Sequence, residues 1–111
     1  MIFIFGPLYS GKRTVAASML HCKLEELSNF AVWDVQERAA QAENLVALAD
    51  GLARYAAVIA TETSGGVIPA DASERAAREA AGRLNCLLAE RAETVVRVFC
   101  GIPLIIRGEL P

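Results

Sequence analysis

The chain has 111 residues, a length that suits a single domain, residues 1–111, with one hydrophobic core. Apolar residues make up 54% of it but aromatic residues only 6%, so the core is expected to consist of alanine, valine, leucine and isoleucine. The net charge of −2 offers no basic field for a nucleic acid, and the apolar runs are shorter than the roughly 20 residues that a membrane span needs. We therefore expect a cytoplasmic protein without nucleic-acid or membrane partners.

Apolar, strand-like segments alternate with helix-like segments along the chain. The run at residues 2–5 is wholly apolar and ends at glycine, as expected for a strand buried on both faces of a parallel sheet. Asp71 and Glu74 have the spacing of a capping box, which predicts the start of a long helix. The expected strands are 2–5, 29–35, 56–61, 94–100 and 104–106, and the expected helices are 12–23, 36–52 and 71–91. This alternation predicts an α/β fold of three layers, with a mainly parallel sheet flanked by helices.

The stretch GPLYSGKRT, residues 6–14, nearly matches the phosphate-binding loop pattern G-x-x-x-x-G-K-[ST]. It stands between an expected strand and an expected helix, where backbone N–H groups and a helix N-terminus can face phosphate oxygens. The lysine of such a loop reaches the β- and γ-phosphates. We therefore expect a P-loop-type fold that binds a nucleoside triphosphate, GTP or ATP, through Gly6, Pro7, Leu8, Tyr9, Ser10, Gly11, Lys12, Arg13 and Thr14.

Arg13 stands where the loop pattern has a serine or threonine that binds Mg²⁺. Arginine has no oxygen for a metal, and Thr14 lies about 100° further around the helix axis. Two interpretations remain open. Either Arg13 neutralises phosphate charge directly, or the loop keeps its shape and has lost its metal chemistry.

Two carboxylates complete the predicted site. Asp34 lies near the end of the expected strand 29–35, where it can hold Mg²⁺ as a Walker-B aspartate does, or cap the helix expected from residue 36. Glu62 follows the expected strand 56–61, where it can orient substrate or metal, or pair with a nearby arginine. The predicted catalytic residues are therefore Lys12, Asp34 and Glu62, and the predicted metal ligand is Asp34.

The second half of the chain resembles one family, the bifunctional adenosylcobinamide kinase / adenosylcobinamide-phosphate guanylyltransferase of cobalamin biosynthesis. The family pattern there is N-E-x-G-x-G-I-V-P, then R-x-x-R-D-x-x-G-x-x-N-Q-x-L-A, then A-D-E-V and a final S-G-x-P. The positions that follow this pattern are Glu62, Gly66, Val67, Ile68, Pro69, Arg75, Arg78, Gly82, Asn85, Leu88, Ala89, Ala92, Glu93, Val95 and Gly101. The family loop G-x-x-x-S-G-K-S also matches Gly6, Ser10, Gly11 and Lys12.

The resemblance implies a fold that binds GTP or ATP with Mg²⁺, phosphorylates a corrinoid alcohol, and forms homo-oligomers, which in the family are trimers. The departures from the pattern are Arg13, Thr61, Ser64, Glu79, Cys86 and Cys100. The sequence between the first helix and Asp34 is too short for the strand, helix and guanylyl-carrying histidine of the family. His21 instead stands at the expected end of the first helix, where the helix dipole favours it.

Two functions therefore remain open from the sequence. The chain is either a shortened, kinase-like phosphotransferase, or a non-catalytic nucleotide- or phosphate-binding regulatory subunit with a degenerate loop. Trp33 and Phe30 are expected in the core or an interface, and Cys22, Cys86 and Cys100 as reduced thiols in or near the core.

Overall fold

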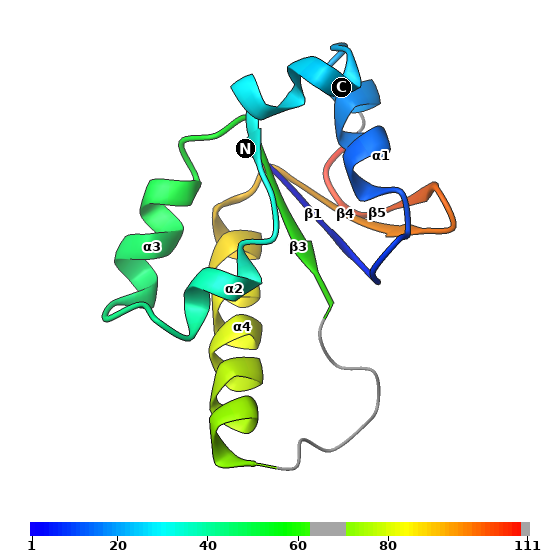
Figure 1. Ribbon diagram of the computed structural model, residues 1–111. Coiled ribbons are helices and arrows are strands. Elements are labelled where there is room, and N and C mark those ends of the chain that lie inside the picture. The colour runs from blue at the N-terminus through cyan, green and yellow to red at the C-terminus, as the bar shows by residue number, and fades with distance from the viewer. Residues whose placement is uncertain (63–70, 110–111) are drawn as a thin grey trace.

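The computed structural model of the chain describes residues 1–62 and 71–109. The strands are β1 (Ile2–Gly6), β2 (Ala31–Val32), β3 (Ala57–Thr61), β4 (Thr94–Phe99) and β5 (Ile102–Arg107). The helices are α1 (Lys12–Met19), the 3-10 helix η1 (Leu24–Asn29), α2 (Gln36–Ala39), α3 (Leu45–Leu52) and α4 (Ala72–Arg91). Figure 1 shows these elements in one unit, with α1 and η1 on one side of the sheet and α2, α3 and α4 on the other.

The five strands form one sheet in the order β2-β3-β1-β4-β5. β1 pairs in parallel with β3 on one side and β4 on the other, and β2 pairs in parallel with β3. Among the strands of the described residues, only β5 is antiparallel, because a turn of two residues joins it to β4. Cys100 and Gly101 have φ values of 53° and 75°, as a type I′ hairpin turn requires. The predicted, mainly parallel sheet is thus confirmed.

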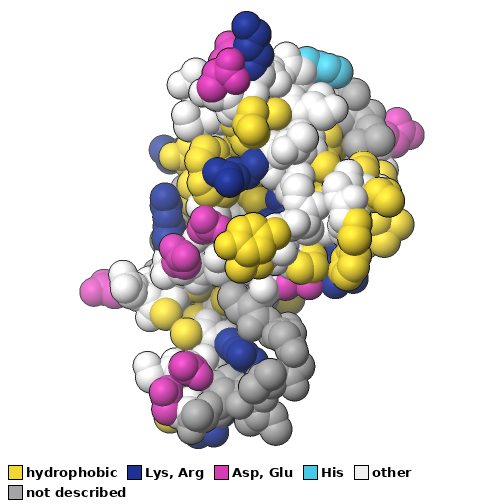
Figure 2. Space-filling model, turned by 45° about the vertical axis from the view of Figure 1, so that its right-hand side comes forward, with side chains coloured by type: hydrophobic (Ala, Val, Ile, Leu, Met, Phe, Trp, Pro, Cys, Tyr) yellow, Lys and Arg dark blue, Asp and Glu magenta, His cyan; other side chains and the backbone are white. Residues whose placement is uncertain are grey.

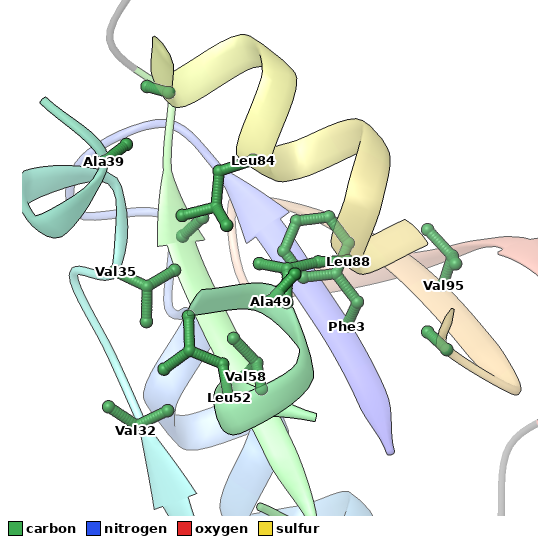
Figure 3. Packing of buried hydrophobic residues seen from close by; sticks show 13 residues of the cluster. Phe3, Val32, Val35, Ala39, Ala49, Leu52, Val58, Leu84, Leu88 and Val95 are labelled. Atoms are coloured by element: carbon green, nitrogen blue, oxygen red, sulfur yellow. The ribbon is translucent and has the colours of Figure 1, made fainter. Parts of the chain in front are cut away.

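Helices cover both faces of the sheet and bury two apolar clusters. On one face, side chains of α1 and η1 pack against Ile4, Ile59 and Val96. On the other, side chains of α2, α3 and α4 pack against Phe3, Val58 and Val95. Figure 3 shows Leu84 and Leu88 of α4 lying over β1 and β3, beside residues from α3. The arrangement confirms the predicted three layers.

The first helix is shorter than expected. α1 ends at Met19, not near residue 23, and His21 follows it in the left-handed region at φ 55°. The N–H of Cys22 donates to the carbonyl of Ala17 (3.0 Å), a bond that closes the helix C-terminus. His21 therefore lies just beyond the helix end, as expected. Residues 20–30 are all described, and between α1 and β2 they contain one helical element, the 3-10 helix η1.

The expected helix 36–52 is two helices. The Asn44 side chain accepts a hydrogen bond from the N–H of Ala47 (3.1 Å) and begins α3, because a capping asparagine favours a helix start over a helix interior. The expected strand 29–35 pairs only at Ala31–Val32. The strand does not extend to residue 35, because Asp34 adopts a φ of 57°, outside the extended region that strands require.

The predicted cap of the last long helix is confirmed. The Asp71 side chain accepts from the N–H of Glu74 (2.7 Å), and α4 ends at Arg91 as expected. Cys86 and Cys100, which were expected in or near the core, are exposed, so that expectation is wrong. Phe30 is exposed as well, so it is not a core residue, and its place in an interface stays a prediction. Residues 64 and 66–69 of the family pattern lie outside the described residues. In the described ranges, no helix is both long enough and apolar enough to cross a membrane.

We expect the substitution Val58→Ala to lower the free energy of unfolding by about 2 kcal/mol, because two buried methyl groups are worth roughly 0.8 kcal/mol each and the cavity adds to this. Val58 is fully buried in β3, whereas Val46 in α3 is 49% exposed. The matched control Val46→Ala should leave stability unchanged or slightly raised, because alanine is the better helix former. Urea denaturation measures both, and equal losses for the two variants would contradict this packing.

Candidate functional site

The loop between β1 and α1 is held in shape by two glycines. A Cβ at Gly6 would collide with the carbonyl oxygen of Val98 in the neighbouring strand. Gly11 has a φ of 89°, and a Cβ there would lie 3.2 Å from the Cα of Gly101. Both glycine positions of the loop pattern therefore need glycine, because of the backbone conformation at Gly11 and the close approach of a neighbouring backbone at Gly6 and Gly11.

The β4–β5 turn is hydrogen-bonded to the loop. The N–H of Gly101 donates to the carbonyl of Ser10 at 2.7 Å. The Ser10 side chain is only 6% exposed, and its hydroxyl has no hydrogen-bond partner among the described residues. A buried hydroxyl without a partner costs free energy. The loop therefore holds a polar group that a bound ligand can satisfy.

A cavity of about 470 Å³ lies against this loop. Its lining consists of residues 8–14, Leu24, Trp33, Asp34, Ile59 and Thr61. Most of the predicted loop residues thus face one cavity, whereas Gly6 and Pro7 contribute backbone outside its lining. Figure 2 shows one face of the molecule, on which acidic and basic side chains lie among exposed hydrophobic ones.

Lys12 is the buried cation of the site. Its side chain is 8% exposed, and Nζ donates a hydrogen bond of 2.6 Å to the carbonyl of Pro7 in the same loop. Burial lowers the pKa of Lys12, the charges of Asp34 and Glu62 act against this, and Arg13 adds to the lowering. The structure thus brings the three predicted catalytic residues into one electrostatic neighbourhood.

Asp34 reaches the cavity by a route that the sequence did not predict. Its strand β2 is not next to β1, because β3 lies between them. Beyond β2 the chain stays beside β3: the N–H of Val35 donates to the carbonyl of Ile59 (3.4 Å), and the N–H of Thr61 donates to Oε1 of Gln36 (3.0 Å). These contacts carry Asp34 across the carboxyl end of β3.

The Asp34 carboxylate makes one long side-chain hydrogen bond among the described residues. Its Oδ1 accepts from the hydroxyl of Thr61 at 3.3 Å. The interpretation of Asp34 as a helix cap is wrong, since the residue that precedes α2 is Val35 and no side chain caps that helix. Asp34 as a metal or substrate ligand stays a prediction.

Glu62 follows β3, the strand adjacent to β1, and its N–H donates to the carbonyl of Gly6 at 2.9 Å. Both of its carboxylate oxygens accept from Arg97 of β4, at 2.7 and 3.0 Å. This bond raises the pKa of Arg97. The expected arginine partner is therefore found, and it occupies the oxygens that a metal would need.

Arg13 does not extend freely into solvent. Its guanidinium carbon lies 5.6 Å from the centroid of the Trp33 ring, a cation–π contact across the cavity. The sequence placed Trp33 in a core or interface and missed its place beside the loop. The available signal was its position next to Asp34, since one carboxylate of the site was predicted there.

The side chains around the cavity do not make a complete Mg²⁺ site on their own. The described residues contain no group of three or more His, Cys, Asp or Glu side chains that could hold a metal ion. Arg13 offers no oxygen, and Glu62 is bound by Arg97. Asp34 is the carboxylate that lines the cavity. His21 does not line it.

A model of the family described as cobinamide kinase / cobinamide phosphate guanyltransferase matches residues 19–106. The match runs from the end of α1 into β5 and leaves the loop 6–14 outside it. The loop geometry is therefore an observation independent of the family match. A search of curated proteins found no match for the chain.

Lys12 gives protein stability a pH dependence of defined sign. Burial lowers its pKa in the folded protein from the ordinary 10.5. The unfolded chain therefore binds more protons than the folded protein as the pH approaches 10.5, and the contribution of Lys12 to the free energy of unfolding rises with pH in that window. We expect urea denaturation to show the wild type gaining stability relative to Lys12→Met between neutral pH and 10.5. If the difference in free energy of unfolding between wild type and Lys12→Met stays constant or shifts against the wild type as the pH rises, the pKa of Lys12 is not lowered in the folded protein.

Proposed function

The chain belongs to the cobinamide kinase / cobinamide phosphate guanyltransferase family, and on this basis we propose that it binds GTP or ATP on residues 6–14 and phosphorylates a corrinoid alcohol. The observation that carries the proposal is the loop itself. Two glycines fix its backbone, the Ser10 hydroxyl has no partner among the described residues, and the buried ammonium of Lys12 is held on the loop carbonyl of Pro7. A phosphate group would give both polar groups a charged partner.

In the proposed reaction, the acceptor hydroxyl oxygen forms a bond to the γ-phosphorus. The bond from that phosphorus to the β–γ bridging oxygen breaks, and the nucleoside diphosphate leaves. Lys12 and the loop N–H groups bind the phosphate oxygens and offset the charge that develops on them. Asp34 orients the hydroxyl and takes its proton.

Arg13 and Glu62 have supporting roles in this proposal. The guanidinium of Arg13 lines the cavity and supplies positive charge where family members have a metal-ligating serine. Nucleotide binding then does not require a Mg²⁺ ion bound to the loop. Glu62 positions Arg97 through their two hydrogen bonds and acts on the reaction only through that residue.

The guanylyl-transfer half of the family's activity is not part of the proposal. Guanylyl transfer through a covalent intermediate needs a nucleophile beside the nucleotide. His21 is the single histidine of the chain, and it lies beyond the end of α1 and outside the cavity lining.

We also propose that the protein is a cytoplasmic homo-oligomer, a trimer as the family resemblance implies. Support for assembly comes from β5, where Ile102, Leu104 and Ile106 alternate along the strand and are 67%, 59% and 56% exposed. Exposed apolar strips of this kind mark interaction surfaces. The cysteines Cys22, Cys86 and Cys100 are unpaired, as in a reducing compartment.

A second candidate function is a nucleotide-binding regulatory subunit without catalysis. Two observations favour it: Arg13 removes the metal-ligating hydroxyl, and Arg97 engages both oxygens of Glu62. Both candidates require nucleotide binding, and only the first requires a phosphorylated product.

GTP or ATP at about 100 times its Kd should raise the Tm by about 10 °C, because binding to the folded state alone adds about 2.7 kcal/mol. We expect this rise in EDTA as well as in Mg²⁺, with pyrophosphate also effective. The variant Lys12→Met should lose the rise, and the control Lys23→Met, an exposed lysine, should keep it. Differential scanning calorimetry measures all three, and no shift with any nucleotide would sink both candidate functions.

The variant Arg13→Ser should make nucleotide binding depend on Mg²⁺, because it returns a hydroxyl to the position that ligates the metal in this loop. The GTP-induced rise in Tm should then be larger in Mg²⁺ than in EDTA. Arg54→Ser, at an exposed arginine outside the cavity, is the matched control and should behave as the wild type. If Arg13→Ser also binds GTP equally well in EDTA and Mg²⁺, Arg13 does not replace a metal.

A further inference from the structure

Arg13 and Trp33 are in contact with each other at the loop cavity. Both side chains belong to its lining, Arg13 from the first turn of α1 and Trp33 from the segment after β2. The guanidinium carbon lies 5.6 Å from the centroid of the Trp33 ring, within the range of a cation–π contact. This contact joins the helix that follows the loop to the segment that carries Asp34.

The Trp33 ring is the fixed member of this pair. It is half-buried and packs against the apolar cluster that α1 and η1 cover. Arg13 is exposed, and a long arginine side chain has many rotamers, which it must give up when it binds a ligand. Contact with a fixed ring restricts these rotamers before any ligand arrives, so less freedom is lost on binding.

The charge of Lys12 acts to push Arg13 out of the cavity. Burial lowers the pKa of Lys12, and the adjacent positive charge of Arg13 lowers it further, because the two like charges repel. Lys12 is held by its hydrogen bond to the carbonyl of Pro7, so Arg13 is the cation that can turn toward solvent. The electron-rich face of the Trp33 ring attracts the guanidinium and opposes this movement.

An aromatic partner leaves the hydrogen-bond donors of the guanidinium available. None of the ion pairs within residues 1–62 and 71–109 includes Arg13. A carboxylate partner occupies the N–H groups of an arginine and offsets its charge, as Glu62 does at Arg97. An aromatic ring has no acceptor oxygen, so the N–H groups of Arg13 stay available for phosphate oxygens.

This inference rests on the proposed function. We propose that Trp33 is a positioning residue for nucleotide binding, whose ring holds the guanidinium of Arg13 in the loop cavity where it binds phosphate oxygens. Trp33 acts only through Arg13 and makes no contact of its own with the phosphates. The pair replaces the loop hydroxyl that acts through a bound metal ion in the usual pattern. The ligand is then a polyphosphate without a loop-bound metal.

A double-mutant cycle tests this role, with the Kd for GTP measured in EDTA by isothermal titration calorimetry. Trp33→Leu should weaken GTP binding about two- to fivefold, the range for an exposed cation–π contact. Trp33→Phe should weaken it less, because phenylalanine keeps a ring that binds cations, although less strongly than tryptophan does. In the Arg13→Met background, Trp33→Leu should have no further effect. The control Tyr55→Leu removes an exposed aromatic ring outside the cavity lining and should bind GTP as the wild type does.

Two results of this cycle would overturn the role of Trp33. An equal loss of affinity from Trp33→Leu in both backgrounds means that the ring contacts the ligand or supports the loop without Arg13. No loss with Arg13 present means that the guanidinium needs no ring to hold it. The Tm of each unliganded variant shows whether it is folded, and Trp33→Phe in both backgrounds gives the same test if Trp33→Leu does not fold.

Failure of this role is separable from failure of the proposed function. The same cycle is measured with pyrophosphate, which has phosphate groups but no nucleoside. If wild type binds pyrophosphate but neither GTP nor ATP, the proposed function fails, and a coupling between Arg13 and Trp33 in pyrophosphate binding still supports the positioning role. If GTP binds and the two substitutions are additive, the positioning role fails while the proposed function stands. Binding of neither ligand overturns both.

Discussion

The buried ammonium of Lys12 is the constraint on which the rest of the site depends. A cation removed from water must find partners inside the protein, or its burial costs several kcal/mol. Here the partners are the carbonyl of Pro7 and the charges of Asp34 and Glu62, which come from the ends of two other strands. The sheet order puts β3 next to β1, and the segment after β2 then brings Asp34 over the end of β3. One lysine thus links the loop to the ends of β2 and β3.

The shape of the loop is independent of this electrostatic arrangement. It comes from close approach of backbones: Gly6 against β4, and Gly11 against the turn at Gly101, whose N–H binds the carbonyl of Ser10. None of these contacts involves the side chain of residue 13. Arginine at that position therefore changes the chemistry of the cavity and leaves its framework intact. The same reasoning explains how the loop, which lies outside the family match, keeps its backbone shape with arginine at position 13.

Much of the fold could be predicted from the sequence, where local signals were strong. The helix cap at Asp71, the apolar run of β1 and the glycines of the loop each act over a few residues, and each was found in place. The single helix expected over 36–52 was wrong because Asn44 caps a new helix there, and propensity gave more weight to the alanines and glutamates around it.

What failed in the site depends on contacts between distant elements. In the observed strand order, β3 lies beside β1 and is followed by Glu62, whereas β2, which precedes Asp34, is one strand further away. No local sequence pattern specifies the order of strands in a sheet. The stacking of Arg13 on Trp33 joins α1 to the segment after β2, and the pairing of Glu62 with Arg97 joins β3 to β4. The charged residues could be identified from the sequence, but only the fold shows which of them already interact with another side chain.

Phosphoryl transfer by this chain is a proposal, and the measurement that tests it most directly follows the γ-phosphate. Wild-type protein is incubated with cobinamide and GTP or ATP carrying a radioactive γ-phosphate, and the corrinoid is separated and counted. We expect label in the corrinoid with wild type and none with Lys12→Met. Unlabelled corrinoid, in a sample whose nucleotide binding is established by the rise in Tm, would contradict it and leave a nucleotide-binding subunit in its place.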